Sequence, residues 1–234
     1  MVRILVPLAV LDGETIASGA AELLAPAEVV LLGYYEIPEQ TAPGQARMTF
    51  EEKAHARLDD ATAVLEGAGA TDVTATMVFT PSVEQSIERV ATEETCDAIC
   101  YLNPAAAVDR LLVTLHGDVD AERIGRFVGR LLAGRDLSVT FLEVIEPGTE
   151  SRLLDRARVA LEGVAVDPTV ADERVIETEA PVRTIGEVAE DYDATVVGEK
   201  EATLAELLFG DYEERIAAAA LGPVLVVRAA DGHS

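Results

Sequence analysis

The segment GEKEATLAELLFGD, residues 198–211, has residue types and a spacing that could bind phosphate. It follows a short apolar run, Thr195–Val197, and precedes a segment with a helical pattern. Gly198 and Gly210 would let backbone N–H groups approach an anion, and a helix that starts after the loop would attract one with its N-terminus. The order of strand, glycine turn, second glycine and helix start therefore predicts a nucleotide site, or a loop derived from one.

The acidity of this loop argues against a bound phosphate. Glu199, Glu201 and Asp211 face a single cation, Lys200. Asp211 stands at the expected N-cap and Glu214 follows three residues later, which is the spacing of a capping box. Two unit charges about 4 Å apart repel by about 4 kcal/mol at an effective dielectric near 20, or about a thousandfold in affinity. We expect a loop kept for folding; binding helped by a bridging Mg²⁺ is the alternative.

A second candidate segment, Leu115-His116-Gly117, lies at the end of an expected strand over residues 110–115. His116 could contact a ligand at the end of this strand. The simpler interpretation, which we favour, is a polar turn residue before a helix capped by Asp118 or Asp120.

The elements that must position these residues alternate between strands and helices. The helical segments carry apolar stripes at i, i+3, i+4 and i+7, as in Ile124, Phe127, Val128 and Leu131. Alternation of this length predicts an α/β fold with parallel sheets and helices on both faces. The expected strands are residues 3–8, 28–35, 72–79, 97–101, 110–115, 137–145, 172–178, 193–197 and 224–228.

An internal repeat divides the chain. Residues 2–25 align with 109–133, and residues 81–101 align with 181–197. We predict two tandem domains, residues 1–104 and 105–230, followed by a tail over 231–234. The first copy lacks the glycine loop, the last helix (about 211–220 in the second copy) and the fifth strand.

Four segments, Ile4–Pro7, Val196–Gly198, Phe209–Ile216 and Gly222–Arg228, carry a family pattern. Through them the chain resembles the universal stress protein (UspA) family as two tandem copies. The resemblance implies Rossmann-like sheets of the adenine-nucleotide alpha hydrolase type, ordered 3-2-1-4-5, and dimers joined through the fifth strand. In some branches it also implies ATP bound beyond strands one and four.

The match is partial at the binding positions that the resemblance implies. Ala9 and His116 stand where the family's nucleotide-binding branch has Asp, Glu201 replaces the second glycine, and Asp211 replaces a hydroxyl residue. We therefore favour no cofactor. If ATP or AMP binds, the implied contacts are Leu115, His116, Gly117, Gly198, Gly210 and Asp211.

The amino-acid composition and net charge disfavour some classes of binding partner. The 234 residues carry a net charge of −25 and are 49% hydrophobic, and Lys53 and Lys200 are the only lysines among 18 basic residues. This acidic, lysine-poor balance favours a protein adapted to high salt, where self-repulsion is screened. It disfavours nucleic acid and anionic membranes as partners. No signal peptide or membrane span is apparent, so we expect a cytoplasmic protein.

Neither a catalytic motif nor a metal motif is present. Cys96 and Cys100 are too few for a disulfide scaffold and are expected to be structural, and His55 is expected on a solvated helix face. We expect a non-enzymatic stress-response or regulatory protein that acts by association with an unidentified protein partner. An ATP or AMP sensor using the second copy is the alternative. The strand Val224–Arg228 would form a homodimer or pair with the first copy, and we favour the homodimer.

Overall fold

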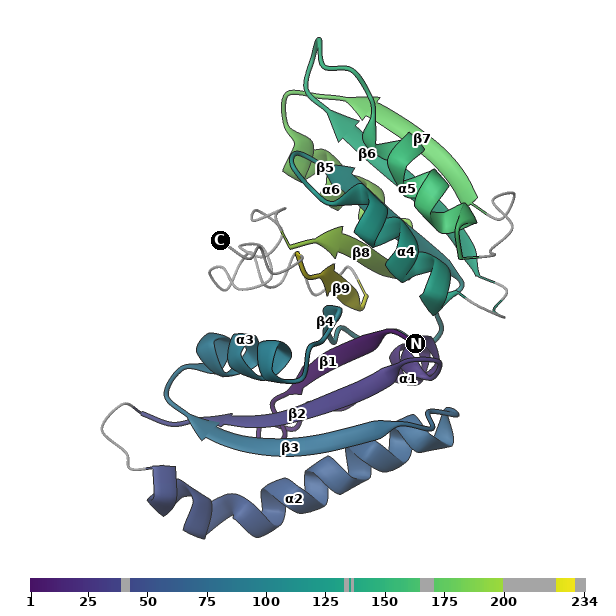
Figure 1. Ribbon diagram of the computed structural model, residues 1–234. Coiled ribbons are helices and arrows are strands. Elements are labelled where there is room, and N and C mark those ends of the chain that lie inside the picture. The colour runs from purple at the N-terminus through teal and green to yellow at the C-terminus, as the bar shows by residue number, and fades with distance from the viewer. Residues whose placement is uncertain (39–42, 133–134, 136, 165–170, 200–221, 230–234) are drawn as a thin grey trace. The chain divides into compact units, whose positions relative to one another are not determined.

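The chain forms two compact units, Met1–Leu102 and Asn103–Ser234. A computed structural model describes residues 1–38, 43–132, 135, 137–164, 171–199 and 222–229 (Figure 1). The predicted helix over 211–220 and the loop residues 200–211 lie outside this part of the chain.

The first unit is a four-stranded parallel sheet with the strand order β3-β2-β1-β4. Figure 1 shows α2 and α3 on opposite faces of this sheet. A cluster of buried apolar side chains that includes Leu5, Val30, Ile87 and Ile99 joins the sheet to α3. The elements are β1 (Arg3–Leu8), α1 (Ser18–Leu24), β2 (Glu28–Glu36), α2 (Pro43–Gly67), β3 (Val73–Thr80), α3 (Val83–Glu93) and β4 (Ala98–Tyr101).

The second unit is a five-stranded parallel sheet with the order β9-β8-β5-β6-β7. Numbered within the unit, this is the order 3-2-1-4-5 that the resemblance implies, so the predicted α/β fold is confirmed. The elements are β5 (Arg110–His116), α4 (Ala121–Leu131), β6 (Ser138–Ile145), α5 (Leu153–Glu162), β7 (Ala171–Glu177), α6 (Pro181–Ala189), β8 (Ala194–Gly198) and β9 (Val224–Val227).

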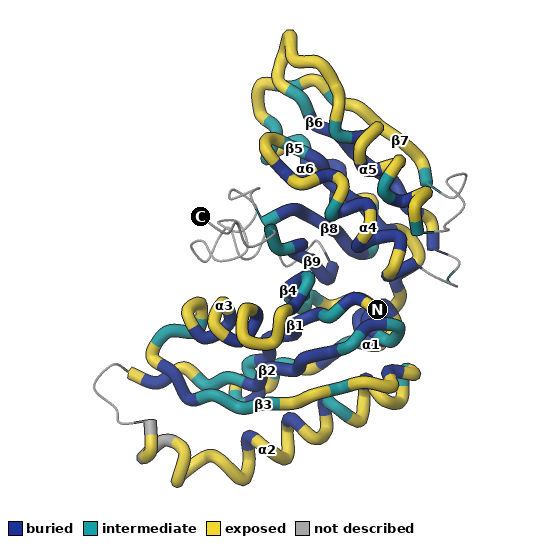
Figure 2. The backbone as a smooth tube through the Cα atoms, viewed as in Figure 1, coloured by how far each residue is buried: buried dark blue, intermediate teal, exposed yellow. Residues whose placement is uncertain are grey.

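The predicted apolar patterns form the core. Figure 2 shows the central strands buried and the outer faces of the helices exposed. The stripe predicted on α4 is buried, with Ile124, Phe127, Val128 and Leu131 all at most 3% exposed. The helix expected over 48–66 begins earlier, at Pro43. A proline fits a first helical position because its missing N–H has no intrahelical partner there.

Two glycines hold α4 close to α5 on one face of the second sheet. A Cβ at Gly125 would lie 2.2 Å from the carbonyl oxygen of Ala157, and one at Gly129 would lie 2.1 Å from Cγ2 of Val164. Real Cβ atoms essentially never approach so closely, so a side chain would force the Ala157 backbone to shift at Gly125 and the Val164 side chain to shift at Gly129. This close packing fixes the position of α4 against α5.

A buried carboxylate holds the start of α5. Glu143 of β6 is 2% exposed. It accepts hydrogen bonds from the Ser151 hydroxyl at 2.7 Å and from the backbone N–H groups of Arg152, Leu153 and Leu154 at 2.9–3.1 Å. Burial raises the pKa of Glu143, but these hydrogen bonds outweigh it and leave the pKa below its ordinary value.

No helix in the part of the chain that the structure describes is long and apolar enough to span a membrane.

Candidate functional site

The structure brings four of the predicted contact residues to one edge of the second sheet. Leu115 and His116 end β5, Gly117 follows, and Gly198 ends the neighbouring strand β8. Strand β6 lies on the other side of β5, so the strand order reverses direction between β5 and β8. Ligands of open parallel sheets bind at such a switch point. The other two predicted residues, Gly210 and Asp211, lie outside the described residues.

Gly198 has a packing reason to be glycine. A Cβ there would lie 2.8 Å from Cγ1 of Val119 and 3.2 Å from Cδ1 of Ile124. The close approach of β8 to the start of α4 therefore requires a residue without a side chain. A phosphate ligand is not needed to explain this glycine.

Leu115 and His116 are the last two residues of β5, where a turn residue was expected at His116, and the chain bends only from Gly117. The ring Nδ1 of half-buried His116 lies 2.9 Å from the carbonyl oxygen of Val144, and since a carbonyl only accepts, Nδ1 carries the proton. Gly117 has a φ of +64°, a conformation that favours glycine. Leu115 is fully buried in the core.

The N-terminus of α4 has its own anion. Asp120 is the N-cap, and its Oδ1 accepts a hydrogen bond of 3.1 Å from the backbone N–H of Arg123. Of the two predicted caps, Asp118 and Asp120, the structure uses Asp120. The carboxylate satisfies one of the helix's first N–H groups and neutralises part of the dipole that would attract a phosphate.

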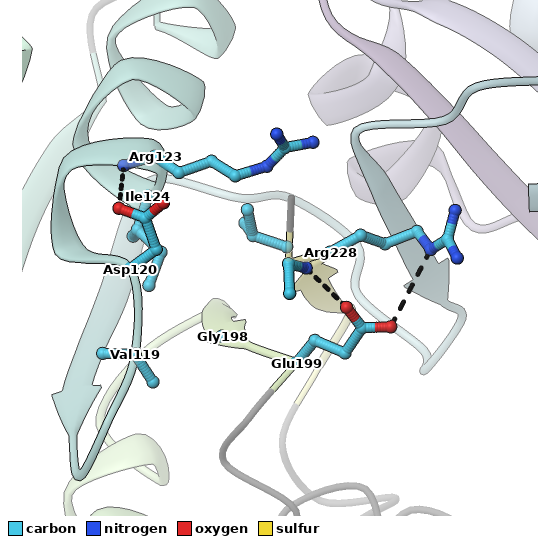
Figure 3. Close-up of a pocket in the computed structure, with 9 residues that line it drawn as sticks. Val119, Asp120, Arg123, Ile124, Gly198, Glu199 and Arg228 are labelled. Atoms are coloured by element: carbon cyan, nitrogen blue, oxygen red, sulfur yellow. Dashed lines mark hydrogen bonds and ion pairs between the residues drawn. The ribbon is translucent and has the colours of Figure 1, made fainter. Parts of the chain in front are cut away.

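A cavity of about 160 Å³ lies between the start of α4 and the carboxyl ends of β8 and β9 (Figure 3). Its wall is apolar at Val119, Ile124 and Val227 and charged at four side chains. Those four are Asp120, Arg123, Glu199 and Arg228.

Sequence reasoning did not single out the two arginines of this cavity. Arg228 directly follows β9, and β9 ends at the same edge as β8, so strand order alone could have placed it there. Arg123 lies in the first turn of α4, three residues after the cap.

Glu199 turns its carboxylate toward the end of β9. Its Oε2 accepts a hydrogen bond from the backbone N–H of Ala229, and its Oε1 lies 3.9 Å from Nε of Arg228. Figure 3 shows both contacts as dashed lines. The first acidic residue of the predicted loop is thus engaged by the protein itself.

The first unit also places a carboxylate after its first strand. The backbone N–H of Ala9 donates a 2.6 Å hydrogen bond to Oε2 of Glu14. Burial raises the pKa of Glu14 above its ordinary value, and this hydrogen bond only partly offsets that effect. Ala9 is the position where the resemblance implies an Asp, and here its N–H already has an anionic partner.

Two cysteines and a histidine are the remaining side chains that the sequence analysis weighed as reactive groups. Cys96 and Cys100 are buried, as predicted, and form no disulfide, and burial raises the pKa of Cys100 to about 12. A thiol with that pKa is not a nucleophile at neutral pH. His55 is exposed on α2, also as predicted. Within the described ranges, no three His, Cys, Asp or Glu side chains form a group that could hold a metal ion.

No protein-family model and no curated protein matches the chain. Solved structures do. A universal stress protein from Archaeoglobus fulgidus DSM 4304 aligns with 98% of this chain and 97% of its own, at 14% identity and a TM-score of 0.62. This likeness confirms the universal stress protein fold that the sequence resemblance predicts.

Two further structures match less well. A protein from Pseudomonas aeruginosa UCBPP-PA14, assigned as a universal stress protein, aligns with 97% of this chain and 92% of its own at 15% identity and a TM-score of 0.46. A universal stress protein in complex with cAMP aligns with 50% of this chain and 95% of its own at 23% identity and a TM-score of 0.37. At these TM-scores neither likeness supports an argument about function.

Proposed function

We propose that this chain, which has the universal stress protein fold, is a non-enzymatic regulatory protein of the UspA type that acts by protein association. In this proposal it is a tandem duplication, its partners are a second copy of the chain and a further protein, and it works without a bound adenine nucleotide. The shared order of strands and helices in the two units supports the duplication.

The observation that carries the proposal is the placement of the protein's own carboxylates at the switch point. Asp120 caps α4, and Glu199 accepts from the N–H of Ala229. In the first unit, Glu14 accepts a hydrogen bond from the backbone N–H of Ala9, the residue after β1. The backbone donors that an incoming phosphate would use at these three positions already have anionic acceptors. A triphosphate would have to displace or repel them.

The association is proposed to use strand β9. Its four residues, Val224–Val227, are apolar and buried, and its ladder with β8 runs in register from Thr195↔Val224 to Gly198↔Val227. Parallel strands of this composition extend sheets readily because each edge presents a row of backbone donors and acceptors. An isologous contact through β9 would give a closed dimer.

Light scattering on the full chain in high salt tests the association. A homodimer is expected for the unmutated protein at micromolar concentration. Val226→Pro, which removes a ladder N–H, is expected to give a monomer, and Val175→Pro in the edge strand β7 serves as the matched control and is expected to remain dimeric. A monomeric unmutated protein would end the homodimer proposal.

A second candidate is an adenine-nucleotide sensor that uses the second unit. The observation in its favour is the cavity at the switch point with Arg123 and Arg228 in its wall. Heat denaturation of freshly purified protein, followed by chromatography of the supernatant, separates the two candidates. Release of ATP or AMP in near-stoichiometric amount would favour the sensor.

A further inference from the structure

The chain folds into a tight turn where β1 of the first unit ends, and we call this segment, residues 9–14, the β1–α1 turn. The backbone N–H of Val10 donates to the carbonyl oxygen of Leu8 at 2.9 Å, and the N–H of Asp12 donates to the carbonyl oxygen of Ala9 at 3.0 Å. Gly13 has a φ of +85°, a conformation that favours glycine. The turn is thus closed by its own backbone hydrogen bonds.

An apolar socket at Gly33 of β2 holds one side of this turn. Val10 is 1% exposed, and a Cβ at Gly33 would stand 3.3 Å from its Cγ1. The same Cβ would stand 3.1 Å from Cδ1 of Leu58 on α2 and 3.0 Å from Sδ of Met77 on β3. Contacts of this length are tighter than nine in ten real Cβ contacts. The missing side chain at Gly33 therefore makes the room that Val10 occupies.

A half-buried carboxyl group holds the other side of the turn. Oε2 of Glu14 accepts a hydrogen bond of 2.6 Å from the N–H of Ala9. Burial raises the pKa of Glu14, the hydrogen bond lowers it by less, and the carboxylate of Asp12 raises it further. Among the described residues, Asp12 is the only charged group whose field shifts this pKa. The closed turn therefore binds a proton more tightly than an open turn with Glu14 in water would.

We infer that the β1–α1 turn is a pH-responsive element that is held closed at acid pH and opens as the pH rises. Its two attachments are Val10 in the Gly33 socket and Glu14 on the N–H of Ala9. An ionised Glu14 favours the open turn, because a charge is better solvated in water than in a half-buried position. Protonation removes that charge, so the apolar contact of Val10 then keeps the turn closed.

Proton binding sets the direction of this change. A carboxyl group whose pKa is raised in the closed state stabilises that state at acid pH, and this contribution is lost as the pH rises through the raised pKa. An unperturbed Glu titrates at about pH 4.3, so the change should begin above about pH 4. Opening would release the N–H of Ala9 and the side chain of Val10 to water. The inference goes beyond the proposed function, because association through β9 requires no movement of this turn.

Amide hydrogen exchange on the full chain tests the inference, measured by NMR from about pH 4 to about pH 7.5. The ionic strength is held constant so that charge screening does not change. The protection factor of the Ala9 amide, which corrects for the intrinsic pH dependence of exchange, reports how often the turn opens. It is expected to fall as the pH rises and to level off once Glu14 is ionised. Amides in the core of β1 should keep a constant protection factor over the same range.

Three variants separate the proton from the apolar contact. Glu14→Gln keeps the size of the side chain and an acceptor for the Ala9 N–H but does not titrate, so the pH dependence should vanish. Glu22→Gln, at an exposed position of α1, is the matched control and should keep it. Val10→Ala should lower the protection of Ala9 by about tenfold or more at every pH, with the pH dependence retained. Circular dichroism checks the fold of each variant.

Three results at the Ala9 amide would overturn the inference. They are a protection factor that does not change with pH, one that increases as the pH rises, and the same pH dependence in Glu14→Gln as in the unmutated protein. An equal loss of protection throughout β1 would also overturn it, because the first unit would then be unfolding as a whole. Glu14→Gln keeps the test decisive if Val10→Ala folds poorly. Light scattering tests the association separately, so failure of the dimer leaves this experiment intact.

Discussion

Gly198 lies against Val119, so that a Cβ at Gly198 would stand 2.8 Å from Val119 Cγ1 and 3.1 Å from its Cβ. The first glycine of a loop with phosphate-loop spacing is thus required by packing between β8 and the start of α4. This relationship separates the structural role of the glycine from any role in binding.

A double-mutant cycle tests that relationship. Gly198→Ala alone is expected to lower the free energy of unfolding by about 1–3 kcal/mol, because the overpacked contact must shift β8 or Val119. In the Val119→Ala background the same change should cost at least about 1 kcal/mol less, since the opposing methyl groups are gone. Urea unfolding of the four proteins gives the coupling energy. Additive effects would show that Val119 is not the reason for the glycine.

The contact between α4 and α5 gives a second prediction with an internal control. Gly125→Ala is expected to destabilise the protein by about 2 kcal/mol or more, because a Cβ would lie 2.2 Å from the Ala157 carbonyl oxygen. Gly186→Ala in α6 meets no atom within 4 Å and should stabilise by about 0.5–1 kcal/mol through helix propensity. Thermal melts of both variants make the comparison. Equal effects of the two substitutions would contradict the close packing.

Glu143 gives a pH-dependent prediction. Its pKa is lowered in the folded protein, so its contribution is complete above the unfolded pKa and is lost as pH falls through the folded pKa. Glu143→Gln is expected to lower the free energy of unfolding by about 1–3 kcal/mol at pH 7, since the ionised acceptor of four hydrogen bonds is lost. The deficit should shrink as the pH approaches 3. Urea unfolding across this range measures it, and Glu146→Gln, in the exposed turn after β6, is the control.

The net charge of −25 gives a prediction about salt. Carboxylates repel each other more in the compact state than in the expanded chain, so stability should fall as KCl is lowered from about 3 M to about 0.1 M. Thermal melts over this range test the expected adaptation to high salt. A constant melting temperature would remove that interpretation.

The fold could be predicted from the sequence because strands and helices show in local patterns, namely short apolar runs for the strands and apolar residues at helical spacing for the helices. The strand β5, expected over 110–115, extends through His116, and β8, expected over 193–197, spans Ala194–Gly198. Apolar periodicity also placed the α4 stripe in the core. The fifth strand was expected to include Arg228, but β9 ends at Val227 and Arg228 enters the cavity wall.

The candidate site was predicted only in part, because its charges meet through tertiary structure. Gly198 and His116 could be placed at strand ends from the chain alone. The partners of Glu199, namely Ala229 and Arg228, lie about 30 residues further along and meet it only because β9 pairs with β8. No spacing rule in the sequence relates Arg123 to Arg228.

The central claim, a universal stress protein fold that works without nucleotide, is tested most directly by titrating ATP into the purified full chain in multimolar KCl with Mg²⁺ present. The protein's own carboxylates at the switch point predict no binding tighter than about 0.1 mM, which corresponds to about −5.5 kcal/mol. Micromolar affinity for ATP, with a stoichiometry of one per chain, would contradict the claim and establish the sensor in its place.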